Sequence, residues 1–160
     1  MKHDSYQESC SVCRTNAEGV PGQGGVIWED DLWFVRHAPS PSGLAGWTML
    51  NAQRHVQGPA HFNDEEAAAF GPVLRHVTRT LEEVTGAPRI YVVAFGESHP
   101  HMHSHLIPRY SNLPSEHTAF GVADLMRGVT AGDLAGGPEE DALAMAAKIS
   151  DALKASPPPS

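Results

Sequence analysis

The sequence predicts an α+β fold, with an antiparallel sheet of about five strands, a long helix packed on it and a C-terminal helix. Three observations support this prediction. Strand-like segments come first, then a helix, two further strands and a second helix. Apolar residues of the long helical segment recur at steps of three and four. Histidines near residue 100 recur at every second position, the period of a strand. We expect the helices to cover one face of the sheet.

The first three strands are expected before residue 51. Residues 26–28 and 32–35 are apolar and aromatic, and they flank an acidic turn at 29–31, which is typical of a hairpin. Residues 38–46 are rich in proline, serine and glycine and are predicted to be a loop. A third strand follows at 47–50.

The long helix is expected to begin after Asn63. An asparagine followed three residues later by Glu66 is a helix-capping pattern. Gly86 is expected to end the helix, and Pro72 to kink or interrupt it. The apolar stripe, which is predicted to be core, consists of Phe70, Leu74, Val77, Leu81 and Val84.

The remaining elements complete one domain of residues 1–155. A fourth strand is expected at 90–95, and the histidine strand follows it. Pro138 opens the C-terminal helix. The proline-rich tail at 156–160 is expected to be disordered.

Four histidines alternate with other residues in the run His99, His101, His103 and His105. On a strand, the last three would share one face at spacings of about 6.6 Å. Imidazole titrates near neutrality, binds metals as the neutral ring and can attack phosphorus. A surface histidine ladder would not explain the apolar pair at 106–107 that follows. The run therefore indicates a functional site.

Two cysteines stand close together at Cys10 and Cys13. A disulfide across so short a gap would stabilise little. A redox motif would need a strand before it and a helix after it, whereas residues 16–25 look like a loop. Half of a zinc site, within a knuckle segment at 8–15, fits better, although two incidental thiols are a third possibility.

Charge and hydropathy exclude several classes of protein. A formal net charge of -8 over 160 residues offers no basic face to nucleic acid or to an anionic membrane. No apolar stretch approaches the length of a membrane span, and the polar start at residues 1–4 does not look like a signal peptide. We therefore expect a cytoplasmic protein without nucleic-acid or membrane partners.

The histidine run, with its lead-in Gly96-Glu97-Ser98, resembles the histidine triad (HIT) superfamily. Its hallmark, His-x-His-x-His before two apolar residues, fits when the triad starts at His101. The similarity spans roughly residues 10 to 110 and is greatest with zinc-containing bacterial HIT hydrolases, which are distant relatives of galactose-1-phosphate uridylyltransferases. It implies a HIT-like sheet and a homodimer.

The resemblance also implies a closed, structural Zn²⁺ site. Four ligands without an open position would make the site structural rather than catalytic. His99 is a rival to His101, and His61 is a rival to His55. The implied ligands are Cys10, Cys13, His55 and His101.

The chemistry implied by the family is nucleotidyl transfer through a covalent histidine intermediate. His103 would attack the α-phosphorus of a nucleoside phosphoramidate or dinucleoside polyphosphate, breaking a P–N or P–O bond. His105 would stabilise charge and could also donate a proton, and Ser98 would contact the phosphate or the leaving group. The candidate substrate-binding residues are Glu97, Arg36 and His37.

Several positions depart from the family pattern. Trp47 stands where many members have histidine, Glu97 where many have glutamine, and Ser104 where an apolar spacer is usual. These departures keep open a non-catalytic, zinc-stabilised nucleotide-binding module. A third hypothesis is a metal-centred enzyme that uses all three strand histidines as ligands.

Other residues have weaker claims to the site. Aromatic residues in short strands are usually core, but they can also stack on a base. Arg109 is expected to pair or cap after the histidine strand. The aromatic candidates are Trp28, Trp33 and Phe34.

Overall fold

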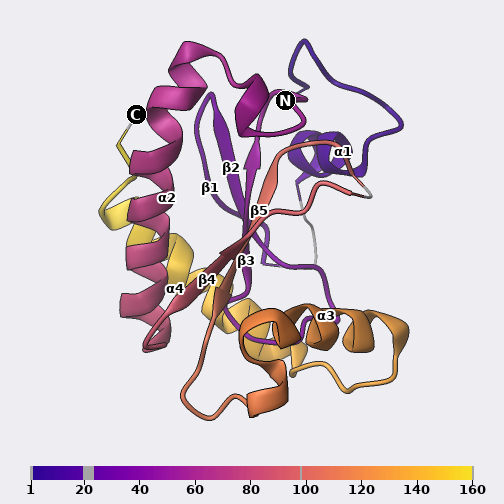
Figure 1. Ribbon diagram of the computed structural model, residues 1–160. Coiled ribbons are helices and arrows are strands. Elements are labelled where there is room, and N and C mark those ends of the chain that lie inside the picture. The colour runs from indigo at the N-terminus through magenta and orange to yellow at the C-terminus, as the bar shows by residue number, and fades with distance from the viewer. Residues whose placement is uncertain (1, 20–23, 98, 160) are drawn as a thin grey trace.

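A computed structural model describes residues 2–19, 24–97 and 99–159 of the chain. It contains a five-stranded antiparallel sheet in the order β1-β2-β3-β5-β4, with α-helices on both faces (Figure 1). The predicted α+β architecture, with an antiparallel sheet of about five strands, is confirmed. The strands are β1 (Val26–Glu29), β2 (Trp33–His37), β3 (Thr48–Ala52), β4 (Ile90–Val93) and β5 (His103–Pro108). The α-helices are α1 (Ser11–Glu18), α2 (Asp64–Thr85), α3 (Val122–Ala131) and α4 (Glu139–Ala155). Short 3-10 turns lie at Pro59–His61, Ser115–His117 and Ala119–Gly121.

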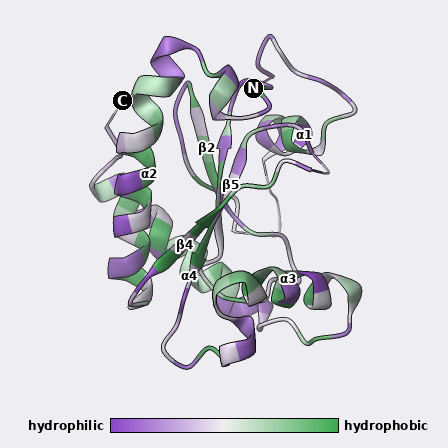
Figure 2. Cartoon of the chain, in the orientation of Figure 1, coloured by the Kyte–Doolittle hydropathy of each residue, from purple (hydrophilic) through white to green (hydrophobic). Residues whose placement is uncertain are grey.

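Helices α2 and α4 cover one face of the sheet and enclose the larger core. Because alternate residues of a strand point to the same face, Val35, Leu50 and Leu106 meet the apolar stripe of α2 there. Ile149 and Leu153 of α4 complete this core. Figure 2 shows hydrophobic strands at the centre and hydrophilic residues on the outer side of α2.

The opposite face of the sheet is also covered, which differs from the expectation of helices on one face. Val122 of α3 packs with Trp47, Met49 and Ile107 in a second apolar cluster. Figure 1 shows α1 and α3 on the side of the sheet away from α2. These two helices were not predicted, because each is short and depends on tertiary packing rather than on its own propensity.

Helix α2 begins and ends where the sequence predicts. The Asn63 side chain accepts a hydrogen bond from the Glu66 N–H, Glu66 closes the capping box, and Gly86 ends the helix in the left-handed conformation. Pro72 does not interrupt the helix, so that alternative is wrong. Pro72 and Ala68 are both exposed, and water can therefore solvate the Ala68 carbonyl that proline leaves without its helical donor.

The cysteine segment is helical rather than loop-like through Glu18. Cys10 is the N-cap of α1, and its Sγ accepts a hydrogen bond from the Cys13 N–H. Near the C-terminus, the carbonyl of Ser156 bonds to the ring of His76 at 2.7 Å. The single domain of residues 1–155 with a disordered tail stays a prediction. In the described part of the chain, no helix combines the length and apolar character needed to cross a membrane.

Candidate metal centre and active-site cleft

Four predicted metal ligands converge beside the N-terminal helix. The donor atoms of Cys10, Cys13, His55 and His101 all lie within 4.8 Å of one another. Cys13 Sγ lies 3.3 Å from His55 Nδ1 and 3.4 Å from His101 Nδ1, and Cys10 Sγ lies 3.5 Å from His101 Nδ1. A tetrahedral zinc ion with usual bond lengths places sulfur and nitrogen ligands about 3.5 Å apart. The four side chains therefore form a cluster that could hold a metal ion.

A second set of contacts fixes the ligands. His101 Nε2–H donates to the carbonyl of Ala52 at 2.7 Å, which leaves Nδ1 as the unprotonated nitrogen facing the thiols. The same carbonyl accepts a hydrogen bond from Asn16 Nδ2 at 2.8 Å, and Asn16 Oδ1 accepts one from Asn51. These bonds tie α1 to β3. The tautomer of His101 is therefore set for metal binding.

Burial separates the metal ligands from their rivals. His101 is fully buried, whereas His99 and His61 are exposed and neither belongs to the cluster. Burial also raises the pKa of the Cys13 thiol, so a thiolate at this position needs a cation beside it. Within the described residues, the cluster includes only one histidine of the triad. The hypothesis of a metal held by all three strand histidines is therefore wrong.

The other two triad histidines line a large cleft of about 910 Å³ on the α3 side of the sheet. The floor is formed by β2, β3 and β5, and the walls by α1, α3, the 38–42 loop, residues 95–97 and His99. Strand β5 begins only at His103, so His101 precedes the strand. The alternation predicted that all three histidines share one face. Only His103 and His105 do so, because His101 lies outside the strand.

His103 has one ring nitrogen held and the other available to the cleft. Its Nδ1–H donates to the carbonyl of His101 at 2.6 Å. Burial is the main cause of its lowered pKa, so the ring is neutral at pH 7. Nε2 therefore carries a lone pair and is the nitrogen that can attack an electrophile in the cleft.

His105 is held by an indole. Trp47 Nε1–H donates to His105 Nδ1 at 3.2 Å, and the two rings meet edge to face with centroids 5.9 Å apart. Burial, reinforced by electrostatic repulsion from Arg36 and from His103 when it is protonated, lowers the pKa of His105 to about 4. The ring centroids of His103 and His105 lie 5.5 Å apart. The two rings are therefore close enough for one phosphoryl group to contact both of them.

Arg36 places a buried cation in the cleft floor. Only 6% of its surface is exposed, and Nη1 donates to the carbonyl of His37 at 3.1 Å. Its Nε has no hydrogen-bond partner, and none of the ion pairs among the described residues includes Arg36. Burial lowers the pKa of this guanidinium to about 10, which still leaves it charged at pH 7. A buried, unpaired cation is suited to bind an anionic ligand.

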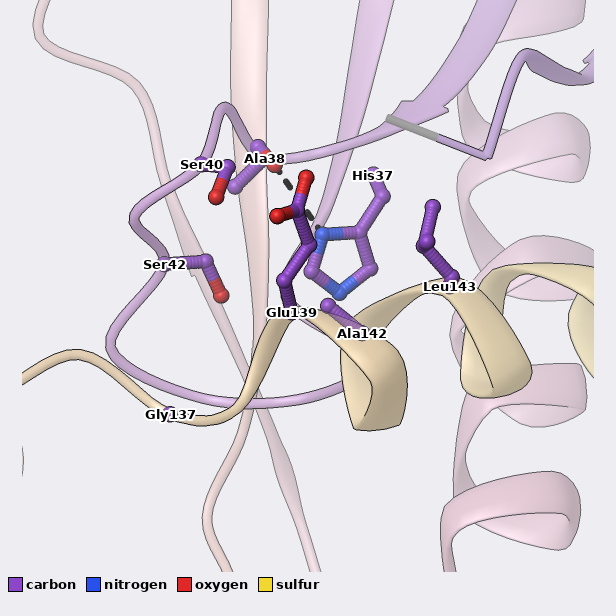
Figure 3. A pocket seen from close by; sticks show the side chains of 8 residues that line it. All are labelled: His37, Ala38, Ser40, Ser42, Gly137, Glu139, Ala142 and Leu143. Carbon is purple, nitrogen blue, oxygen red and sulfur yellow. Dashed lines mark hydrogen bonds between the residues drawn. The ribbon is translucent and has the colours of Figure 1, made fainter. Parts of the chain in front are cut away.

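His37 does not line the cleft, contrary to the expectation for a substrate-binding residue. Consecutive strand residues point to opposite faces, and the ring of His37 lies against the start of α4 near Glu139 and Ala142 (Figure 3). Its Nδ1–H donates to the Ala38 carbonyl at 3.0 Å, and Nε2 accepts from the Gly46 N–H at 2.9 Å. Both ring nitrogens serve the fold.

Gly96, Glu97 and His99, which precede the triad, also line the cleft. Glu97 and His99 are exposed there, and the ring centroids of His99 and His103 lie 6.3 Å apart. Ser98, a candidate for phosphate contact, lies outside the described residues. Arg109 is not among the cleft residues.

The aromatic candidates belong to the core rather than to the cleft. Trp33 and Phe34 are fully buried, and Trp28 packs against the main core. The buried ring of Trp33 contacts Phe62 and Phe70. Ser104 is likewise buried on the core side of β5.

Sequence reasoning missed several cleft residues. Trp47 was noted only as a departure from the family pattern, although an indole beside the triad can donate a hydrogen bond. Ser11 and Thr15 of α1 and Arg127 of α3 also line the cleft. No local signal marks them, because their helices reach the cleft only through tertiary packing.

Comparison with known proteins supports the fold. No family model matches the sequence, and no curated protein matches it. A HIT-like protein from Bartonella henselae aligns over 92% of this chain and 99% of its own, with 17% identity and a TM-score of 0.66. A zinc-bound histidine triad protein from Mycobacterium smegmatis aligns over 92% and 98%, with 18% identity and a TM-score of 0.64. A histidine triad protein from Sinorhizobium meliloti aligns over 88% and 93%, with 24% identity and a TM-score of 0.59. The chain has the fold of histidine triad proteins.

Proposed function

We propose that this protein is a HIT-type nucleotide hydrolase or nucleotidyl transferase. It cleaves a P–N or P–O bond at the α-phosphate of a nucleoside phosphoramidate or a dinucleoside polyphosphate. The reaction passes through a covalent nucleotidyl-histidine intermediate.

The observation that supports this proposal best is the arrangement of His103. Its Nδ1–H is bound to a backbone carbonyl, and its Nε2 is left to the cleft. Nε2 attacks phosphorus, the leaving group departs with the electron pair, and water then releases the nucleotide from the ring. His105 donates a hydrogen bond to a phosphoryl oxygen as charge develops. Arg36 binds an anionic part of the same substrate.

We propose that the metal is Zn²⁺ and that its role is structural. The four donors are two thiols and two imidazoles, at separations that fit a tetrahedral ion and leave no ligand position for substrate. The metal would stabilise the link between α1 and β3. Because Ser11 and Thr15 of α1 line the cleft, this link also holds one cleft wall in place.

The remaining assignments are predictions. Glu97 and Ser98 are predicted to contact substrate, and Glu97 lines the cleft. A homodimer and a cytoplasmic location are predicted, the first from the family resemblance. Val92 on the edge strand β4 is 47% exposed, which makes that edge a candidate for the interface.

The test is a search for the covalent intermediate. The zinc-loaded protein is mixed with adenosine phosphoramidate or with a diadenosine polyphosphate, quenched within milliseconds and digested. Mass spectrometry is then expected to find AMP on the peptide that contains His103, and His103→Ala is expected to carry none. Tight nucleotide binding without turnover or adduct would instead favour the non-catalytic binding module.

A further inference from the structure

The hydrogen bond between Trp47 and His105 fixes which nitrogen of His105 carries the proton. An indole N–H can only donate, so His105 Nδ1 must accept. In the neutral ring the proton then lies on Nε2, on the side of the ring opposite the indole. Trp47 is 2% exposed and His105 is 9% exposed, so water does not replace this bond. An imidazolium would present Nδ1–H to the indole N–H and lose the bond.

The charges around His105 also oppose its protonation. His103 on the same strand and Arg36 on β2 are the cationic or titratable groups that act on it directly. Arg127 of α3 and His99 line the same cleft. Glu97 is the one carboxylate among the described residues that line the cleft, and it is exposed to solvent. Within the described lining of the cleft, no buried carboxylate therefore faces His105 to stabilise an imidazolium.

We propose that Trp47 holds His105 as a neutral hydrogen-bond donor, and that the cleft therefore favours leaving groups that depart without taking up a proton. A neutral imidazole N–H can bind a phosphoryl oxygen but is far too weak an acid to protonate a departing nitrogen near pH 7. This inference rests on the proposed nucleotidyl transfer and names the substrate class. Trp47 is a positioning residue, and it acts through His105.

The reaction balances without an acid when the leaving atom is oxygen of low basicity. His103 Nε2 forms a bond to the α-phosphorus, the P–O bond breaks, and the electron pair stays on the departing phosphate oxygen. A phosphate group has a second pKa of about 6, so it leaves as an anion. An amine leaving group would need a proton at the moment of P–N cleavage. A phosphoanhydride therefore suits this cleft better than a phosphoramidate.

The position of Arg36 is independent evidence that the substrate carries an anionic leaving group or a neighbouring phosphate. Its guanidinium is buried in the cleft floor, and its Nε has no partner among the residues that the structure describes. In the β2–β3–β5 register, Arg36 stands opposite Met49, and Met49 stands opposite His105, so Arg36 lies in the same row as His105. Two strand spacings separate their backbones by about 10 Å, which is within reach of a substrate with several phosphates.

The first experiment measures the tautomer directly and does not depend on turnover. Nitrogen-15 NMR of histidine-labelled, zinc-loaded protein at pH 7 is expected to show His105 with Nε2 protonated and Nδ1 unprotonated. Trp47→Phe, which keeps an aromatic ring but removes the donor, is expected to lose this single tautomer. A protonated Nδ1 in the parent protein would overturn the assignment, even if the variant failed to fold.

The second experiment compares two substrates that differ only in the leaving atom. The AMP para-nitrophenyl ester leaves through oxygen, and the AMP para-nitroanilide leaves through nitrogen. We expect the parent to prefer the ester in kcat/KM by about 10²-fold or more, with no loss of activity as the pH rises from 6 to 8. Trp47→Phe is expected to reduce that ratio about tenfold and to make turnover of the anilide fall as the pH rises, because a protonated His105 can then act as the acid.

The two ideas fail in different ways. An unchanged ratio and pH profile in Trp47→Phe, or equal turnover of both substrates by the parent, would overturn the leaving-group preference while leaving nucleotidyl transfer intact. Absence of turnover and of an adduct with both substrates would overturn nucleotidyl transfer and the leaving-group preference together. The NMR result would still decide whether Trp47 fixes His105.

Discussion

The two ends of the histidine run contain the same side chain in different surroundings. His101 faces two thiols, and its outer nitrogen is bound to the Ala52 carbonyl. His103 and His105 each have one nitrogen bound to the protein and line an open cleft. All three pKa values are lowered, and burial is the largest cause in each case. His101 has no ring nitrogen free to face the cleft, whereas His103 and His105 each have one. This difference distinguishes the structural role proposed for His101 from the chemical roles proposed for the other two.

The largest difference is expected between His103→Ala and the parent in turnover. Loss of the nucleophile should lower kcat/KM for nucleotide substrates about 10⁴-fold, since the covalent route is removed. Steady-state kinetics with metal analysis measures this. The thermal unfolding temperature and zinc content should stay near parent values. If His103→Ala also lost its zinc, the catalytic role of His103 could not be separated from the stability of the metal site.

The reciprocal change is Cys13→Ser at the metal end. It should abolish zinc binding and lower the unfolding temperature by about 10 °C, because binding of a structural metal contributes directly to folding free energy. Calorimetry and atomic emission measure the two effects. Arg14→Ser, an exchange beside the ligand that leaves the four donors intact, is the matched control. Unchanged stability after zinc loss would contradict a structural role.

A pH dependence should distinguish His105 from an ordinary histidine. Its folded pKa of about 4 lies below the unfolded value of about 6.5, so the neutral ring stabilises the fold fully above pH 6.5. This contribution should decline as the pH falls from 6.5 to 4, reaching a loss of about 3 kcal/mol. Denaturant unfolding at pH 7 and pH 4.5 measures it. His105→Gln, whose side-chain carbonyl can still accept from Trp47, should show a shallower loss. If the parent and His105→Gln lost the same free energy of unfolding between pH 7 and pH 4.5, the pH dependence would not come from His105.

The smallest effect is expected from Arg36, which lies in the cleft but does not react. Arg36→Met should raise KM for a nucleotide about tenfold to a hundredfold, because an anion loses its buried partner. It should also raise the free energy of unfolding by about 1 kcal/mol, since a buried unpaired charge is removed. Arg36→Lys should fall between the parent and Arg36→Met. A destabilised Arg36→Met with unchanged KM would assign Arg36 to the fold.

The sequence by itself determined the elements whose signals are local. Asn63 and Glu66 formed the predicted capping box, and Gly86 ended the helix, because these contacts need only neighbouring residues. The period-two run predicted that His103 and His105 share a face, since a strand fixes that alternation. The order of strands and helices was sufficient for the α+β class.

Only the tertiary structure decided which partner each functional side chain meets. His101 does not line the cleft, because β5 starts two residues later. The fold of the loop after β3 decided that His55, and not His61, joins the metal-ligand cluster. Arg36 and His37 were treated alike in the sequence, but the strand turns one into the cleft and the other towards α4. The donor for His105 is 58 residues away in sequence, and no local pattern encodes such a contact. Long-range packing sets these distances, and with them the chemistry.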